Sequence, residues 1–225
     1  METFTYKEIL QQPSCWIKEY EVLLEEKTRI QAFLEKYLTN ETDIVLTGAG
    51  TSAFIGDAIA PLLRGVWKNV RAVATTDIVT NAADYLVADK PLLLISFARS
   101  GNSPESVAAV NLANAICKNV AHIYITCNKN GHLAQSANAE NILSLLLPEE
   151  TDDKSLAMTS SFSTMLLTCL MISQIDHIEA ERERIEAVAA NAQAVLSDYA
   201  GAIEAIAARP FERGVFLGSG PMKGI

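Results

Sequence analysis

Hydroxyl side chains gather in three short segments of this sequence. The segments are Gly48-Ala-Gly50-Thr51-Ser52, Ser96-Phe-Ala-Arg99-Ser100-Gly101-Asn102-Ser103-Pro104-Glu105-Ser106 and Ala157-Met-Thr159-Ser160-Ser161-Phe162-Ser163-Thr164. Short hydroxyl groups, backbone N–H groups and a single arginine are donors that suit a phosphate dianion. The residue types therefore indicate a site for a phosphorylated small molecule.

The first segment is a glycine turn that opens a predicted helix. Glycine lets the backbone turn sharply and approach a ligand, and the first turn of a helix presents free N–H groups to an anion. A dinucleotide-binding fingerprint needs its third glycine three residues after the second, whereas Gly56 follows Gly50 by six. The alternative to a ligand site is an ordinary strand–helix turn in which Ser52 caps the helix.

The second segment follows the most apolar run of the sequence. We predict Ser103 as the N-cap of a helix, with Pro104 at its first position and Ser106 at its third. Capping accounts for these residues but leaves the other hydroxyls, Arg99 and Gly101 unexplained at the end of a strand. This segment therefore favours phosphate binding most strongly.

The third segment also begins a predicted helix. Thr159 or Ser160 is expected to be its N-cap. Ser163 and Thr164 are expected to face the helix interior or to bond back to its backbone. Five hydroxyl residues within six positions are more than one cap requires.

Alternating strands and helices position these segments. The predicted strands are Asp43–Thr47, Val70–Thr75, Leu92–Phe97, Ala121–Cys127 and Ile142–Leu147, and the predicted helices are Thr51–Val66, Pro104–Cys117, His132–Ala137 and Thr159–Ile175. Because the strands do not alternate apolar with polar residues, they are expected to be buried on both faces of a parallel sheet covered by helices. Ligands bind at the carboxyl ends of such strands, where the hydroxyl segments lie.

The flanking regions divide the chain further. Residues 1–40 are predicted to be a helical lead-in that starts near Pro13, residues 41–175 the α/β domain, and residues 176–209 a linker helix. In residues 210–225, Val215–Leu217 followed by Gly218-x-Gly220 repeats the strand and glycine turn seen at 44–50. We interpret this as the start of a second copy of the domain, cut off; the competing interpretation is an edge strand of the first sheet.

Bulk properties exclude several classes of protein. A net charge of −9 over 225 residues disfavours a nucleic-acid partner. The longest apolar runs are too short to span a bilayer, and we expect no signal peptide. Four cysteines without CxxC spacing are expected to be buried free thiols in a reducing compartment, which predicts a cytoplasmic protein. Three histidines without metal-binding spacing give no support for a metal site, and no cofactor is expected.

The three segments, in this order and spacing, resemble the SIS domain of phosphosugar isomerases and binding proteins over about residues 41–175. The stretches 47–57, 75–81, 93–106 and 157–161 are similar to the bacterial tagatose-6-phosphate ketose/aldose isomerase family, also described as galactosamine-6-phosphate deaminase/isomerase. The resemblance implies an α/β fold, namely a flavodoxin-like three-layer sandwich with a five-stranded parallel sheet, preceded by an N-terminal helix. It also implies a tandem pair of such domains, the second beginning near Arg213.

The resemblance carries over to individual residues. Expected phosphate ligands are Ser52, Ser100 and Ser103, with Arg99 as a further candidate, and the residues expected near the sugar are Gly50, Thr51, Thr159 and Ser160. Two positions depart from the glucosamine-6-phosphate synthase relatives, because Ala98 stands in place of a serine and Arg99 in place of a glutamine. Phosphate contacts at position 98 must therefore come from the backbone.

The implied reaction is conversion of galactosamine 6-phosphate to tagatose 6-phosphate with release of ammonia, or ketose/aldose isomerisation. Either needs an acid/base that moves a proton between C1 and C2. The resemblance implies that such groups lie in the second domain and after it, so the catalytic residues stay unassigned and residues 1–225 alone are expected to show no turnover. Nearby carboxylates are expected to be structural: Asp77 as a helix cap, Glu105 as a first-turn charge, Glu150 as a solvated loop residue, and Asp57 without a role.

Two other functions compete. A non-catalytic sugar-phosphate sensor would need a basic helix-turn-helix module, which residues 1–40, with their many glutamates, do not supply. A nucleotide-binding α/β domain is disfavoured by the glycine spacing. The expected partner is a small sugar phosphate, and a homo-oligomer is expected, with the Ala-rich helix 183–208 either at the contact or packed on its own domain.

Overall fold

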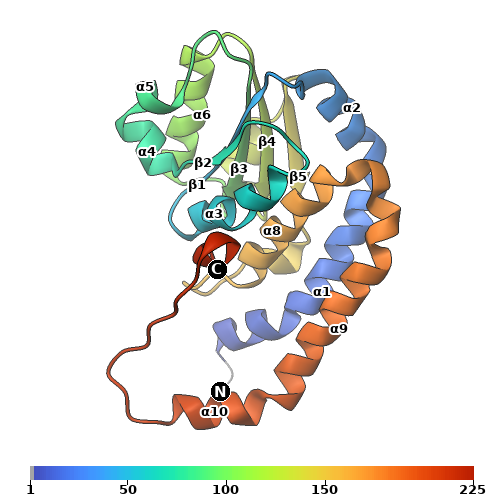
Figure 1. The fold of residues 1–225 in the computed structure, drawn as a ribbon, viewed down its shortest axis with the longest axis vertical. Coiled ribbons are helices and arrows are strands. Elements are labelled where there is room, and N and C mark those ends of the chain that lie inside the picture. Colours follow the sequence, from blue (N-terminus) through green and yellow to red (C-terminus); the bar gives the residue numbers. More distant parts are fainter. Residues whose placement is uncertain (1–2) are drawn as a thin grey trace.

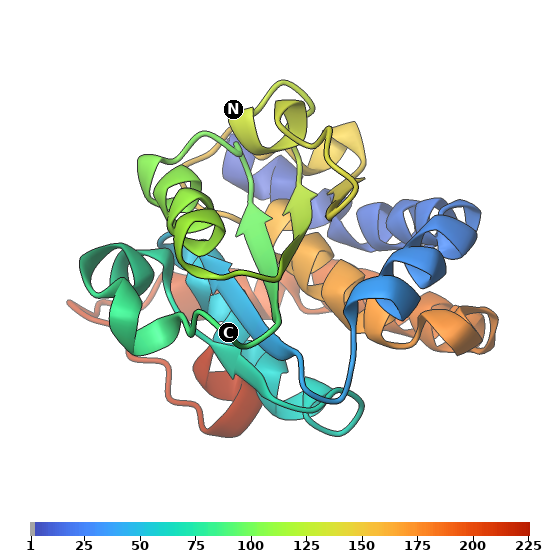
Figure 2. The same cartoon turned by 90° about the horizontal axis from the view of Figure 1, so that it is seen from above.

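Five parallel strands form the centre of the molecule, and helices cover both faces of the sheet (Figures 1 and 2). The structure is a computed structural model that describes residues 3–225. The strands are β1 (Asp43–Gly48), β2 (Val70–Ala72), β3 (Leu92–Ala98), β4 (Val120–Thr126) and β5 (Ile142–Leu146). Their order, β2-β1-β3-β4-β5, is that of flavodoxin-like folds. The predicted fold class is confirmed.

Alternate residues of each strand pack against different helices. On β1, Ile44 and Leu46 belong to one hydrophobic cluster, which also contains residues of the N-terminal helices and of the helix that begins at Ser160. Val45 belongs to a second hydrophobic cluster, on the opposite face of the sheet. The first face is covered by α3 (Thr51–Leu63) and α8 (Ser160–Ser173), with α1 (Phe4–Glu25), α2 (Lys27–Tyr37) and α9 (Arg182–Asp198) around them. The second face is covered by α4 (Thr75–Thr80), α5 (Ala82–Tyr85), α6 (Pro104–Ile116) and α7 (His132–Gln135). Both faces are apolar, which explains why the strands read as continuous hydrophobic runs.

Glycine brings helix α3 close to the sheet. A Cβ atom at Gly56 would lie 3.1 Å from the Cβ of Ala72 and 3.2 Å from that of Leu46. Such contacts are tighter than most Cβ atoms make, so a side chain at this position would have to push α3 and the strands β1 and β2 apart by a few tenths of an ångström. The helix that follows the glycine turn is thereby fixed over the carboxyl end of β1.

The N-terminal helix begins earlier than the sequence predicted. Pro13 was expected near its start, but it lies inside α1, and Thr3 caps the helix by accepting a hydrogen bond from the backbone N–H of Tyr6 at 3.2 Å. A proline leaves the carbonyl four residues before it without its usual donor. Here the side chain of Gln12 donates to that carbonyl, on Ile9, at 3.1 Å. A neighbouring amide therefore compensates for the proline, and the helix continues to Glu25.

Strand β2 is shorter than predicted. The expected strand 70–75 ends at Ala72, and Thr75 instead begins α4. The hydroxyl of Thr75 is buried and donates to the carbonyl of Gly48 at 3.1 Å. This bond ties the start of α4 to the end of β1 and turns the chain away from the sheet.

The last part of the chain leaves the sheet. Helix α9 lies along α1, with Ile185 and Ala189 buried, while residues 201–207 of α10 (Ala200–Ala207) are exposed (Figure 1). The competing interpretation of Val215–Leu217, an edge strand of the first sheet, is wrong: these residues lie in an irregular segment that leads to the short turn η3 (Gly220–Lys223) beside α3. Gly224 sits directly against the α3 backbone, since a Cβ there would lie 2.4 Å from the carbonyl oxygen of Phe54.

The two remaining short helical turns, η1 (Glu149–Thr151) and η2 (Ile175–Glu181), flank α8. Within residues 3–225, helices long and apolar enough to cross a bilayer are absent.

Candidate functional site

A small cavity of about 110 Å³ lies at the carboxyl ends of β1 and β3. The residues that line it come from the first two hydroxyl segments: Ala49, Ser52, Phe97, Ala98, Arg99, Ser100, Gly101, Ser103 and Ser106. Strands β1 and β3 are neighbours, and the chain leaves them towards opposite faces of the sheet. The cavity therefore occupies the topological switch point, where doubly wound folds bind ligands.

The glycine turn forms one wall of the cavity. Gly50 has φ 57° and ψ −127°, a conformation that favours glycine, and it is the N-cap residue of α3. Ser52 is 4% exposed, and its hydroxyl donates to the sulfur of Met158 at 3.7 Å. The alternative prediction, in which Ser52 caps α3, is wrong, because Ser52 is the second residue of that helix and its side chain lines the cavity.

The serine loop forms the opposite wall. Ser103 is the N-cap of α6 and Pro104 its first residue, as predicted. The Ser103 hydroxyl, however, donates to the hydroxyl of Ser106 at 2.6 Å instead of bonding a backbone group of the first turn. Gly101 takes a left-handed φ of 65°, and the hydroxyl of Ser100 accepts from the N–H of Asn102 at 3.3 Å.

Two helices begin at this cavity. Residues that line it lie in or beside the first turns of both α3 and α6. Among residues 3–225, which the structure describes, no side chain caps either of these two helices. On α3, the N–H groups of Ser52 and Ala53 already bond to the carbonyls of Ala49 and Gly50, so the free first-turn N–H groups belong mainly to α6. These groups and the positive end of each helix dipole favour an anion. The arrangement can hold a phosphate between two helix N-termini.

Arg99 connects the cavity to the loop that precedes the third hydroxyl segment. It lines the cavity, and one of its guanidinium nitrogens donates to the carbonyl of Ser155 at 2.9 Å. One donor of the guanidinium thus holds the loop before α8, and several others remain for a ligand.

Asp153 organises the third segment. It is 5% exposed, and one carboxylate oxygen accepts from the N–H groups of Thr159 and Ser161, both at 2.9 Å. The hydroxyls of Thr159, Ser160 and Ser161 also donate to this carboxylate. Thr159 is the N-cap residue of α8, as predicted, but its side chain makes no cap bond: an aspartate six residues before Thr159 supplies the acceptor.

Thr159 and Ser160 do not line the cavity. Ser160 is fully buried and also accepts from the side chain of Gln11 at 2.9 Å, while Thr159 is partly exposed beside Asp153. Ser163 bonds back to the carbonyl of Thr159 at 3.2 Å, as predicted. The structure thus brings together the four residues predicted to bind phosphate and places Thr159 and Ser160 in the network around Asp153.

Helix α1 also holds this third segment. Glu8 is 5% exposed and accepts from the backbone N–H groups of Lys154 and Ser155, the latter at 3.2 Å. Sequence reasoning missed Glu8, Asp153 and Met158. The pairing of Glu8 with residues nearly 150 positions away leaves no local pattern that would reveal it.

The four carboxylates considered from the sequence lie outside the cavity. Asp57 is exposed on α3, and Glu105 lies in the first turn of α6 as predicted. Asp77 was predicted to be a cap but lies in the first turn of α4, whose N-cap residue is Ala74. Glu150 is paired with Lys18, which lowers the pKa of its carboxyl. Of the residues that the structure describes, the cavity lining contains no carboxylate.

The cysteines and histidines do not form a further site. All four cysteines are free and buried, as predicted, and burial raises the pKa of the Cys15 thiol to about 11. His122 is fully buried beside the side-chain oxygen of Asn114 at 3.0 Å, and burial lowers its pKa to about 4. Metal-binding groups of three or more His, Cys, Asp or Glu are absent from residues 3–225.

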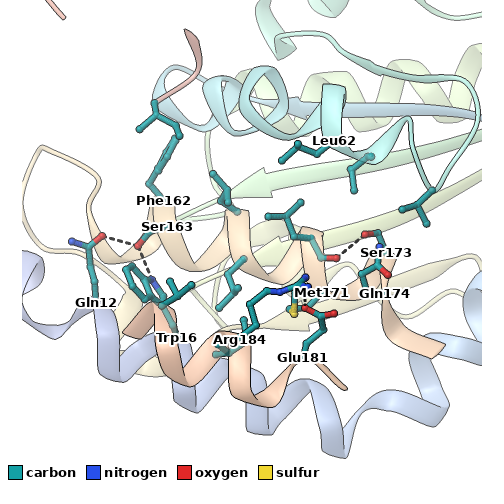
Figure 3. Close-up of a pocket in the computed structure, with 18 residues that line it drawn as sticks. Gln12, Trp16, Leu62, Phe162, Ser163, Met171, Ser173, Gln174, Glu181 and Arg184 are labelled. Atoms are coloured by element: carbon teal, nitrogen blue, oxygen red, sulfur yellow. Dashed lines mark hydrogen bonds and ion pairs between the residues drawn. The ribbon is translucent and has the colours of Figure 1, made fainter. Parts of the chain in front are cut away.

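A larger hollow of about 880 Å³ lies elsewhere, between α1, α3, α8 and α9 (Figure 3). Its lining is mainly apolar, with Leu62, Phe162 and Met171 among the side chains around it. Three of the polar side chains at its edge are already paired with one another: Ser163 accepts from Trp16 at 3.0 Å and donates to Gln12 at 2.7 Å. A phosphorylated ligand needs converging donors, so the smaller cavity is the better candidate.

A parallel sheet of order β2-β1-β3-β4-β5 with an anion-sized cavity at its switch point defines a flavodoxin-like ligand-binding domain. Comparison with known protein families identifies the SIS domain over residues 37–173. The chain belongs to the SIS domain family, and the resemblance inferred from its sequence is confirmed.

Individual relatives are similar along nearly the whole chain. The D-galactosamine-6-phosphate deaminase AgaS of Escherichia coli is 47% identical over 226 residues, which cover 99% of this chain and 58% of the relative. The deaminase of the same name from Shewanella sp. strain ANA-3 is 42% identical over 228 residues, with the same shares covered. The crystal structure of tagatose-6-phosphate ketose/aldose isomerase from Escherichia coli has a TM-score of 0.92 and 46% identity, covering 99% of this chain and 61% of that one. The chain spans 58% of the length of the curated relatives it matches.

Proposed function

We propose that this chain is the phosphate-holding part of a phosphosugar isomerase or deaminase that acts on an amino-sugar or ketose 6-phosphate. The proposed reaction is conversion of galactosamine 6-phosphate to tagatose 6-phosphate and ammonia, or ketose/aldose isomerisation. The observation that carries the proposal is the convergence of serine hydroxyls and two uncapped helix N-termini on one cavity at the switch point. The named activities of relatives at 47% and 46% identity support the choice of substrate class.

Each cavity residue has a proposed role. Ser52, Ser100, Ser103 and Arg99 hold the phosphate, because their donors line a space too small for a whole sugar. Gly50 and Thr51 are exposed at the start of α3 and are proposed to face the sugar, together with Thr159. Ser160 is fully buried, so we propose that it supports Thr159 through their shared partner Asp153.

Local donors must bind the phosphate against the field of the whole chain. The net charge of −9 repels a dianion at long range. Each hydrogen bond to a charged group contributes about 1.5–3 kcal/mol, so a few such bonds in the cavity outweigh a screened long-range repulsion. Affinity is therefore expected to come from the phosphate more than from the sugar.

We propose that the proton-transfer groups lie outside residues 1–225. Two observations support this: the cavity lining of the described residues lacks a carboxylate, and the chain spans 58% of its relatives' length. Holding the phosphate then fixes the substrate so that groups elsewhere reach C1 and C2. Turnover by a chain extended over the relatives' full length, with none by residues 1–225, is the expected result. The absence of a carboxylate from the cavity lining, among the residues that the structure describes, also keeps a non-catalytic sugar-phosphate sensor as the second candidate.

The domain organisation is also a proposal. We divide the chain into a lead-in (1–40), an SIS domain (41–175), a linker helix (176–209) and the start of a second SIS domain (210–225). Phe216 and Leu217 are 97% and 94% exposed, and such apolar residues are suited to a strand inside another sheet. We further propose a cytoplasmic homo-oligomer, supported by four free cysteines and by the exposed apolar residues of α10.

Substitution of the serine loop tests the proposed phosphate site. Ser100→Ala and Ser103→Ala should each weaken binding of galactosamine 6-phosphate by about 1–3 kcal/mol, the scale of a hydrogen bond to a charged group. Calorimetry measures the affinities, and thermal unfolding of each variant reports any loss of fold. Galactosamine without phosphate serves as the ligand control and should not bind at millimolar concentration. Unchanged affinity in both variants, or equal binding of the free sugar, would remove the phosphate assignment.

A further inference from the structure

We infer that Ser106 is a positioning residue of the phosphate cavity, which holds the hydroxyl of Ser103 so that the first turn of α6 stays open to the anion. The inference rests on the proposed function. Ser106 is the third residue of α6, it is 2% exposed, and it lines the cavity together with Ser52, Ser100 and Ser103. A buried serine at this position therefore belongs to the cavity as well as to the helix.

The contact between the two serines is specific. The hydroxyl of Ser103 donates to that of Ser106 across one helical turn, at an oxygen–oxygen distance of 2.6 Å. This distance is at the short end of the range for hydroxyl pairs. Ser103 has the extended backbone of an N-cap, with φ −62° and ψ 130°, and an N-cap serine usually accepts from the N–H of the second or third helical residue. Here its hydroxyl makes no such bond within the described chain.

The direction of this hydroxyl decides which groups a phosphate can use. A phosphate dianion accepts hydrogen bonds and donates none. If Ser103 capped α6, its oxygen would occupy the N–H groups that the anion needs. Because Ser106 takes the Ser103 hydroxyl instead, the backbone donors of the first turn remain available.

The pair also delivers one hydroxyl donor to the ligand. Two hydroxyls joined by one hydrogen bond share two protons, of which one lies between them and the other is free. When the anion binds, Ser103 turns its proton to the anion and accepts from Ser106, and this bond behind it strengthens the Ser103 donor. The two serines are therefore expected to act as one unit.

Substitution of Ser106 separates this role from a purely structural one. In Ser106→Ala, Ser103 is released to cap α6, so the melting temperature should not fall. The dissociation constant for inorganic phosphate and for galactosamine 6-phosphate should rise about tenfold, as expected for one charge-assisted bond. Ser106→Thr keeps a hydroxyl and should bind within about twofold of the unsubstituted protein. Ser173→Ala is the matched control, because Ser173 is a part-buried helical serine that bonds the carbonyl of Leu170.

A double-substitution cycle read by calorimetry completes the test. Ser103→Ala with Ser106→Ala should bind no more weakly than Ser103→Ala alone, because the two hydroxyls form one unit. Additive losses, or a Ser106→Ala variant that melts lower but binds normally, would overturn the inference and leave the phosphate site standing. If the unsubstituted protein binds neither inorganic phosphate nor the sugar phosphate, the proposed function falls and the inference falls with it.

Discussion

Removal of the Asp153 carboxylate should destabilise the protein strongly. In the folded state this carboxylate accepts two backbone N–H bonds at 2.9 Å and three hydroxyl bonds, all at the start of α8. Asp153→Ala removes the cap and leaves the hydroxyls of Ser160 and Ser161, which are fully buried, without this acceptor. Loss of a cap costs about 0.5–2 kcal/mol and each unsatisfied buried donor about 1–3 kcal/mol.

The expected total is about 3–5 kcal/mol, because the hydroxyl of Ser160 keeps its contact with Gln11 and hydroxyls can rotate. Urea unfolding followed by circular dichroism measures this loss, and the melting temperature should fall by about 6–20 °C for a chain of this size. Asp153→Asn keeps one acceptor oxygen and should lose less than the alanine variant.

Asp152→Ala is the matched control. The neighbouring aspartate pairs with Lys154 at 2.8 Å on the surface, where such pairs contribute about 0–1 kcal/mol. A loss below about 1 kcal/mol in Asp153→Ala, equal to that of the control, would refute the reasoning. It would mean that α8 keeps its start without the carboxylate.

Two further predictions concern a buried carboxyl and a strained turn. Burial raises the pKa of Glu19 to about 8, so the folded protein keeps a proton that the unfolded chain loses above pH 4.5. The stability that this carboxyl contributes is present at low pH and is lost as the pH rises towards 8. The free energy of unfolding should therefore fall between pH 6.5 and 8, by at most about 1.4 kcal/mol per pH unit, and Glu19→Gln should flatten this fall. An unchanged slope of the free energy of unfolding against pH, measured by urea titration, would contradict this. This pH window lies above the range in which His122 titrates, because burial lowers the pKa of His122 from 6.5 to about 4. Gly50→Ala should lower the free energy of unfolding, measured in urea, by about 1–3 kcal/mol, because the backbone φ of 57° is strained for alanine. A steric clash is not the reason, since a Cβ at this position would meet no atom within 4 Å. Gly201→Ala, in helix α10, should instead stabilise by about 0.5–1 kcal/mol, and equal effects at both glycines would speak against backbone strain.

The sheet and its helices could be predicted because their signals are local. Parallel strands buried on both faces appear as unbroken apolar runs, and all five were found, with β2 shorter than expected. The glycine turn and the serine loop were placed at strand ends for the same reason, and the structure brings them to one cavity. Segment 215–217 carries a similar apolar pattern but is exposed and irregular, because a strand pattern forms a strand only where a sheet accepts it.

The network behind the third hydroxyl segment could not be predicted. Its acceptors are Asp153, in an acidic loop, and Glu8, near the start of the predicted helical lead-in. Both carboxylates are buried by contacts between segments far apart in the chain. A periodic pattern reports which face of a helix is apolar, but it does not report which buried carboxylate meets which backbone N–H group.

The contacts of helix α1 affect how this protein should be cut for study. The family match starts at residue 37, which suggests a minimal fragment without α1. Such a fragment would lose Glu8 from the loop at 154–155, Glu19 from Thr168, and the hydroxyl of Tyr20 from the carbonyl of Ile178. It would also expose the apolar surface of α8 to water and invite aggregation. The useful boundary for a recombinant fragment is therefore the capped start of α1 at Thr3, some thirty residues before the family match begins.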